Sequence, residues 1–118
     1  MSESNIKVSA VSKPFVISAV IFVFAGSIVG SIWMMFILGA QDFSFARSSF
    51  SLHKTFQVDG FLTLLIMGVG YMIVPRFRNV PLPSSSLAYL SFILIMLSIV
   101  LSAISAISLE ALIVVSAN

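Results

Sequence analysis

Three long apolar stretches dominate this chain and leave few options for its fold. They run from Phe15 to Leu38, from Leu52 to Val74 and from Leu87 to Leu109. Each reaches the roughly 20 apolar residues that an α-helix needs to cross the hydrocarbon core of a bilayer. Only the second stretch contains formally charged residues, Lys54 near its start and Asp59 further along. The sequence therefore predicts an all-α integral membrane protein with three transmembrane helices.

The composition points the same way. Of the 118 residues, 59% are hydrophobic and 8% are charged, whereas soluble domains carry about 25% charged residues. A chain with so few charged residues cannot form a surface that faces water, so its surface must be covered by the lipid bilayer or by other integral membrane subunits. The chain has no cysteine, which excludes disulfides and thiolate metal sites. Its six basic residues form no cluster, so we expect no nucleic-acid partner.

Short polar segments separate the three stretches. The segment from Gly39 to Ser51 reads as a loop, and the segment from Pro75 to Pro83 reads as a helix break because proline lacks a backbone N–H donor. The serines at 84–86 are candidate N-caps for the last helix. We expect a single three-helix membrane domain over residues 1–118, with spans at approximately 14–38, 52–75 and 86–110.

The basic residues also predict an orientation, because positively charged loops favour the cytoplasm. Four of them flank one end of the bundle and two flank the other: Lys7, Lys13, Arg76 and Arg78 against Arg47 and Lys54. We expect a multi-pass protein of the cell membrane, with the N-terminus cytoplasmic and the C-terminus outside. This orientation places His53 at the outer interface.

Two of the helices carry small or polar residues suited to packing against other helices. Gly26 and Gly30 form a GxxxG pattern, which lets helices approach closely in lipid, although Ala19 is expected to lie off that face. In the third helix the serines share one stripe, which we interpret as a surface for helix or subunit packing. The stripe comprises Ser91, Ser98, Ser102 and Ser105, with Ser108 close to the same face.

The second helix has two polar faces. His53, Gln57 and Gly60 follow one, whereas Thr55, Asp59 and Thr63 follow another about 120° away, from the ~3.6 residues per helical turn. His53 and Asp59 are therefore not expected to touch. Asp59 either meets another helix or a partner's cation, or is kept protonated by desolvation. We interpret Asp59 and Thr63 as packing residues, and His53 either as a solvated interface residue or as a ligand.

The second stretch resembles the second helix of heme-copper oxidase subunit I. A histidine at the outer end of the helix is followed by a Gly-Phe pair, small residues, an aromatic residue and a closing Pro-Arg-Phe. The first stretch, with Phe24, Ala25, Gly26 and Gly30, is similar to that family's first helix. The resemblance covers about residues 15–80 and rests mainly on His53, Gly60, Phe61, Gly68, Gly70, Tyr71, Pro75, Arg76 and Phe77.

The resemblance implies that His53 is an axial ligand of a low-spin heme. The family has twelve helices and several further histidines, whereas this chain has three apolar stretches and one histidine. A relative of this kind is truncated, and it cannot reduce oxygen alone. We therefore expect no cofactor in this chain alone, and any heme would be shared with a partner that supplies the second ligand.

These observations lead to an expected function. The sequence contains no nucleophile–base pair, phosphate-binding loop or cluster of metal ligands, so we expect no enzymatic activity. We expect a non-catalytic accessory subunit of a large energy-transducing membrane metalloenzyme complex, of the respiratory or terminal oxidase type. The alternatives are a small helical subunit of a copper-dependent membrane monooxygenase of the ammonia or methane type, a heme-binding electron-transfer or gas-sensing protein that uses His53, and a small transporter that uses Asp59.

Overall fold

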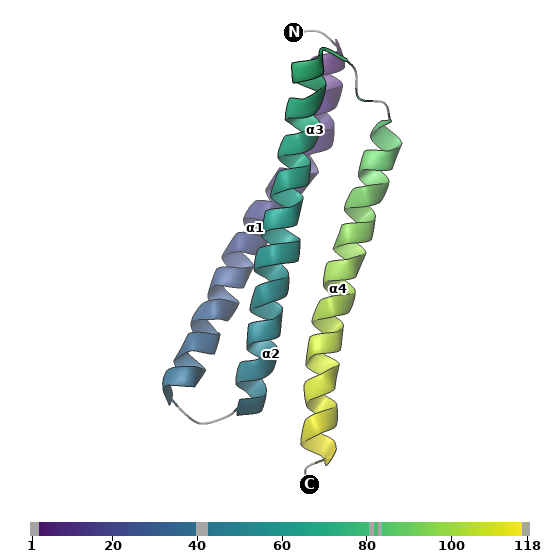
Figure 1. Ribbon diagram of the computed structural model, residues 1–118. Helices are drawn as coiled ribbons and strands as arrows, with labels where there is room; N and C mark the ends of the chain where they lie inside the picture. The colour runs from purple at the N-terminus through teal and green to yellow at the C-terminus, as the bar shows by residue number, and fades with distance from the viewer. Residues whose placement is uncertain (1–2, 40–42, 81, 83, 117–118) are drawn as a thin grey trace.

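The chain folds into helices that form three antiparallel rods (Figure 1). A computed structural model describes residues 3–39, 43–80, 82 and 84–116, with side chains described outside 3–9, 43–48 and 109–114. These residues contain no strand, and the all-α prediction is confirmed. The elements are α1 (Glu3–Gly39), α2 (Phe43–Lys54), the π-helix η1 (Thr55–Thr63), α3 (Leu64–Arg78) and α4 (Ser85–Ser116), with α2, η1 and α3 continuous as one rod.

Each rod is long and apolar enough to cross a membrane, as the sequence predicts. Within the described residues the three candidate spans are Ala10–Gly39, Ser49–Arg78 and Ser85–Ser108. The first two are several residues longer than expected. The structure places the start of α1 and the end of α3 at the same end of the bundle, at the top of Figure 1. Which side of the membrane this end occupies stays a prediction.

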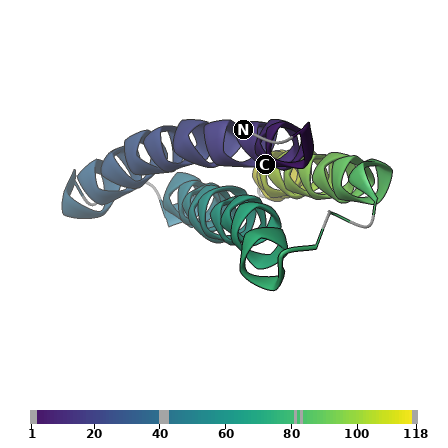
Figure 2. The ribbon, with the colours of Figure 1, turned by 90° about the horizontal axis from the view of Figure 1, so that it is seen from above.

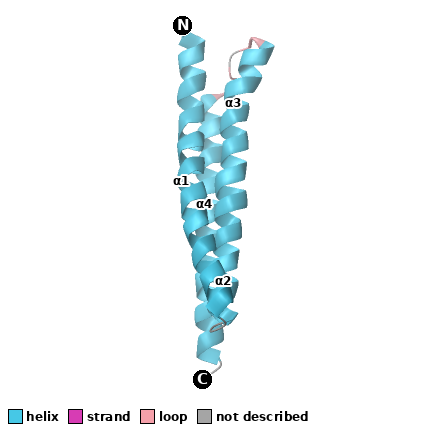
Figure 3. Cartoon of the chain, turned by 90° about the vertical axis from the view of Figure 1, so that its left-hand side faces the viewer, coloured by secondary structure: helices cyan, strands magenta, loops and turns pink. Residues whose placement is uncertain are grey.

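The bundle is long and narrow, with principal extents of 63 × 25 × 16 Å. The rod of α2, η1 and α3 packs along α1, and α4 lies beside α2 and η1. Figure 2, viewed from above, and Figure 3, viewed from the side, show that no helix is surrounded by the others. Each helix therefore keeps a broad outward face.

The helices extend through two of the breaks expected from the sequence. The segment 39–51 is largely not a loop, because α2 begins at Phe43. The segment 75–83 does not break the helix at Pro75, which lies inside α3. A proline removes one backbone hydrogen bond from a helix. Membrane helices tolerate this loss where neighbouring helices pack around the proline. Similarly, α1 starts at Glu3 and continues through Pro14.

α3 ends instead at Asn79, by a hydrogen-bonded C-terminal motif. Asn79 has left-handed backbone angles, with φ 50° and ψ 37°. Its N–H donates to the carbonyl oxygen of Arg76 at 3.3 Å, and the N–H of Val80 donates to that of Pro75 at 3.2 Å. This is the Schellman arrangement, which asparagine tolerates. At the other side of the connection, Ser84 caps α4 as expected, since its hydroxyl accepts from the N–H of Leu87 at 3.4 Å.

The core joins all three rods at Phe15, which is fully buried. Its ring centroid lies 5.2 Å from that of Tyr71 on α3 and 5.0 Å from that of Phe92 on α4. Such tilted and edge-to-face pairs add about 0.5–1.5 kcal/mol beyond burial. At the opposite end, Trp33 of α1 packs against Phe50 of α2, with a centroid distance of 5.0 Å and the ring planes tilted by 41°.

Most large apolar side chains remain outside this core. They cover the outward faces of all three rods, and the most exposed include Phe24, Met35, Leu38, Ile66, Phe77 and Leu87. A continuous apolar exterior of this kind needs lipid or protein around it. Together with the three spans, it supports a multi-pass membrane protein in contact with a bilayer.

Candidate functional site

His53 points into the interface with α1 and is hydrogen-bonded there. Its Nδ1 atom lies 2.7 Å from the backbone carbonyl oxygen of Gly26, and the contact is partly buried. Since a carbonyl oxygen only accepts, Nδ1 carries the hydrogen and donates. In the neutral imidazole, the lone pair then resides on Nε2. A backbone carbonyl of this kind is what orients many metal-binding histidines.

The two glycines of the GxxxG pattern each accommodate one polar side chain. A Cβ atom added at Gly30 would lie 2.6 Å from Nδ1 and 2.7 Å from Cε1 of His53, and one added at Gly26 would lie 3.0 Å from Nε2 of Gln57. The glycines were predicted to serve helix packing. The structure places them in the α1 interface with α2 and η1, where their missing side chains leave room for an imidazole and an amide.

The same face of α1 extends further than the sequence suggested. Ala19, expected to lie off the glycine face, is fully buried. Phe22 packs against Gly60 of η1, where an added Cβ would lie 2.6 Å from the Phe22 ring. The interface therefore continues from Gly30 to Phe15. His53, Gln57 and Gly60, which were assigned to one helical face, all contact α1.

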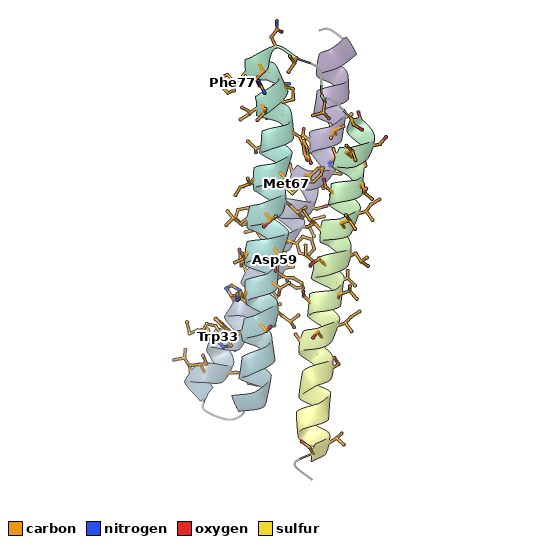
Figure 4. The ribbon with its side chains drawn as sticks, turned by 45° about the vertical axis from the view of Figure 1, so that its right-hand side comes forward. Trp33, Asp59, Met67 and Phe77 are labelled. Carbon is orange, nitrogen blue, oxygen red and sulfur yellow. The ribbon has the colours of Figure 1, made fainter. Side chains whose placement is uncertain are left out.

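Asp59 faces the other way. Its side chain is exposed, in line with its assignment to a different face from His53. Its neighbours on the surface are apolar and also exposed: Val58 at 46%, Leu62 at 47% and Ile66 at 63%. From Ser49, where the span begins, the helix rises about 15 Å to Asp59. Figure 4 shows Asp59 well inside the bundle's length, between the levels of Trp33 and Met67.

Asp59 lies on the π-helix η1, which sequence reasoning missed. Nine residues, Thr55–Thr63, adopt this rare form. π-Helices are frequent at functional sites because they rearrange side chains along a helix. Thr63, assigned to packing, uses its hydroxyl within the segment, donating to the carbonyl oxygen of Val58 at 3.0 Å. The 3.6-residue period assumed for the whole span carried no signal of this change.

The serine stripe of α4 contacts another helix of this chain at Ser91, whereas three of its other members are exposed. Ser98, Ser102 and Ser105 are all exposed. The serine that joins α4 to another helix is Ser91, whose hydroxyl is 3.1 Å from that of Tyr71. Tyr71 was named above for the family resemblance, and its hydrogen bond to this stripe was not predicted. Among the residues whose side chains are described, the exposed serines Ser98, Ser102 and Ser105 make no hydrogen bond to another helix.

The chemistry of the donor set limits what the site can hold. Among the described residues, no group of three or more histidine, cysteine or acidic residues is close enough to bind a metal ion. His53, the only histidine in the sequence, offers one nitrogen lone pair. A single imidazole can form at most one bond to a metal ion through this nitrogen.

Comparison of the chain with protein-family models, with curated proteins and with solved structures gives no match. The likeness to heme-copper oxidase subunit I therefore rests on the residues quoted for it, and it stays a hypothesis.

Proposed function

We propose that this chain is a non-catalytic accessory subunit of a larger membrane complex, and that Asp59 marks the surface that a partner covers. The observation that carries the proposal is the exposure of this carboxyl group on an apolar outer face, within a membrane span. An acidic residue near the middle of a membrane helix costs about 2.5–3.5 kcal/mol when it faces lipid.

A partner helix that supplies a hydrogen-bond donor or a cation at this depth offsets that cost. Ionisable residues within membrane spans normally face a bundle interior, a partner or a water-filled cavity. Asp59 is exposed on η1, so a helix of another subunit can cover it. The exposed serines of α4 are a second polar feature suited to bonds between helices in lipid.

The resemblance of the second helix favours a respiratory or terminal oxidase as the complex, and the alternative is a copper-dependent membrane monooxygenase. In either case this chain contributes helices to the assembly, and the chemistry occurs on other subunits. The distinction depends on the identity of the polypeptides that remain bound to it.

The test is purification of the full chain from its native membranes in mild detergent, followed by native mass spectrometry. We expect stoichiometric membrane polypeptides to remain bound to the wild type. D59L should reduce their retention about tenfold, as expected for loss of a bond worth ~1.4 kcal/mol. L62A, on the same face but without a polar group to lose, is the matched control. A stable lone monomer, or equal retention in D59L, contradicts the proposal.

A second candidate function is heme ligation by His53, which the hydrogen bond from Nδ1 to Gly26 favours by leaving Nε2 for a ligand. The discriminating variant is H53N, because an asparagine amide places its nitrogen near the position of Nδ1 and lacks the lone pair of Nε2. If the histidine binds heme, the purified complex shows a Soret band that H53N shifts or removes while the complex stays assembled. No band, or an unchanged one, excludes this function.

A further inference from the structure

A cavity of about 380 Å³ opens at the end of the bundle opposite to His53. It lies on the flank of α3, below the connection from α3 to α4, and its lining includes Met67, Gly70, Val74 and Leu82. Its volume is within the roughly 300–1,000 Å³ of typical ligand pockets. Figure 4 marks the level with Met67, near its inner part, and Phe77, at the end of α3. Nothing in the proposed function uses this cavity.

One charged residue lines this otherwise mainly apolar cavity. Arg78, the last residue of α3, contributes to the lining and is exposed. Deeper in, the hydroxyl of Tyr71 is already hydrogen-bonded to Ser91 at 3.1 Å. A ligand that matches this lining is apolar along most of its length and has an anionic group beside Arg78, where the guanidinium can bind it.

The position of Arg78 along the bundle narrows the class of ligand further. Arg78 ends the span Ser49–Arg78, so the part of the cavity that Arg78 lines lies at the boundary between hydrocarbon and headgroups. Four of the six basic residues in the sequence belong to this end: Lys7, Lys13, Arg76 and Arg78. Basic residues beside such a pocket attract anionic lipid headgroups, by about 1 kcal/mol for each charge near the surface.

We propose that this cavity binds an anionic phospholipid, with one acyl chain against Met67, Gly70 and Val74 and the phosphate on Arg78. The guanidinium selects the charge, and the apolar wall holds the chain. The phospholipid fills the space between α3 and the connection to α4, so it belongs to the folded protein and is not merely part of the surrounding bilayer.

Two glycines allow a clean substitution test. An added Cβ at Gly70 meets nothing within 4 Å, and the same is true at Gly39, at the other end of the bundle. G70L therefore fills the cavity without a clash at its first atom, whereas G39L adds the same side chain far from it. R78Q removes the charge that lines the cavity, and R76Q removes an equal charge from an exposed residue of the same helical turn that does not line it.

The experiment measures lipid retained by the full chain, with its bound subunits, in native mass spectra after incubation with equimolar phosphatidylglycerol and phosphatidylcholine. We expect wild type to prefer phosphatidylglycerol, R78Q to lower that preference about fivefold, and G70L to abolish retention. R76Q and G39L should change retention less than twofold. Soluble glycerol phosphate should not compete, since it lacks the acyl chain.

Several results overturn the proposal. Equal retention of the two lipids shows that charge does not select the ligand. An equal effect of R76Q and R78Q shows that only the surface charge matters, and retention in G70L shows that the cavity is not the site. Competition by glycerol phosphate assigns the site to a small anion. Circular dichroism of each variant separates these results from misfolding, and R78Q decides the question if G70L fails to fold.

Discussion

The imidazole of His53 donates from Nδ1 to the carbonyl oxygen of Gly26 and lies directly over Gly30, one helical turn further along α1. The two glycines therefore have different uses. Gly26 offers its backbone oxygen, and Gly30 leaves the space in which the ring sits. An alanine at position 30 would have to displace the imidazole, since its Cβ would lie 2.6 Å from Nδ1.

Substitution of His53 separates this structural bond from any role as a ligand. H53A should lower the free energy of unfolding by about 0.6 kcal/mol, and by no more than about 1.7 kcal/mol, the average and the maximum for hydrogen bonds between membrane helices. H53N should retain most of that stability, because its amide nitrogen can donate to Gly26. Unfolding in mixed detergent with increasing dodecyl sulfate measures the difference. Equal losses in both variants would show that the hydrogen bond contributes nothing measurable.

Gly68 and Gly70 offer a matched pair on one helix. At Gly68 an added Cβ would lie 2.8 Å from Cβ of Phe15 and 3.3 Å from the backbone nitrogen of Val16, whereas at Gly70 it meets nothing within 4 Å. We expect G68A to destabilise the bundle by about 1–3 kcal/mol, because the backbone of α1 cannot give way. G70A should be neutral or stabilising by up to about 1 kcal/mol, from helix propensity.

The same unfolding assay checks this pair. The sign of the difference decides the interpretation, since both changes are chemically identical. If G70A is as harmful as G68A, the close approach of α1 and α3 at Phe15 is not what the glycine serves.

Phe15 is expected to be the most sensitive apolar position. F15A removes the ring that contacts both Tyr71 and Phe92, and should cost about 3–5 kcal/mol, the range for truncating a buried phenylalanine. F24A, at a ring that is 67% exposed on the same helix, is the control and should have little effect. Thermal aggregation in detergent gives the ranking, and similar midpoints for the two variants would contradict the assigned core.

The hydrogen bond between Tyr71 and Ser91 is expected to fasten α3 to α4. In a double-mutant cycle of Y71F and S91A, we expect a coupling energy of about 0.6–1.7 kcal/mol. The aromatic ring stays in place in Y71F, so the contact with Phe15 is preserved. Additive effects of the two substitutions would show that α4 is held by apolar packing alone.

The sequence predicted the three membrane-spanning helices better than the residues at which they begin and end. Apolar length is enough to locate a membrane helix, and the seryl N-cap at Ser84 has a local signature. The helix through Pro75 was missed because the preference of proline to end helices is a tendency, which packing in the bundle overrides. At Asn79 the actual ending depends on a left-handed residue, for which asparagine is a weaker signal than glycine.

The candidate site was predicted only where its geometry depends on a single helix. The separation of His53 from Asp59 follows from helical spacing alone. The contact of His53 with α1 could not be predicted from the second helix alone. It depends on how α1 packs against that helix, which brings Gly30 to the position opposite the imidazole. The π-helix was invisible for a further reason, since it changes the backbone hydrogen bonds of Thr55–Thr63 while keeping the composition of an ordinary span.

The contact between Trp33 and Phe50 gives the protein a built-in fluorescent probe. Trp33 is the only tryptophan in the sequence, and it lies in the His53 half of the bundle, far from Phe77 at the other end (Figure 4). Its emission therefore reports the local environment of one end alone. A ligand that quenches or shifts this fluorescence acts near α2, whereas one that binds beside α3 leaves the spectrum unchanged.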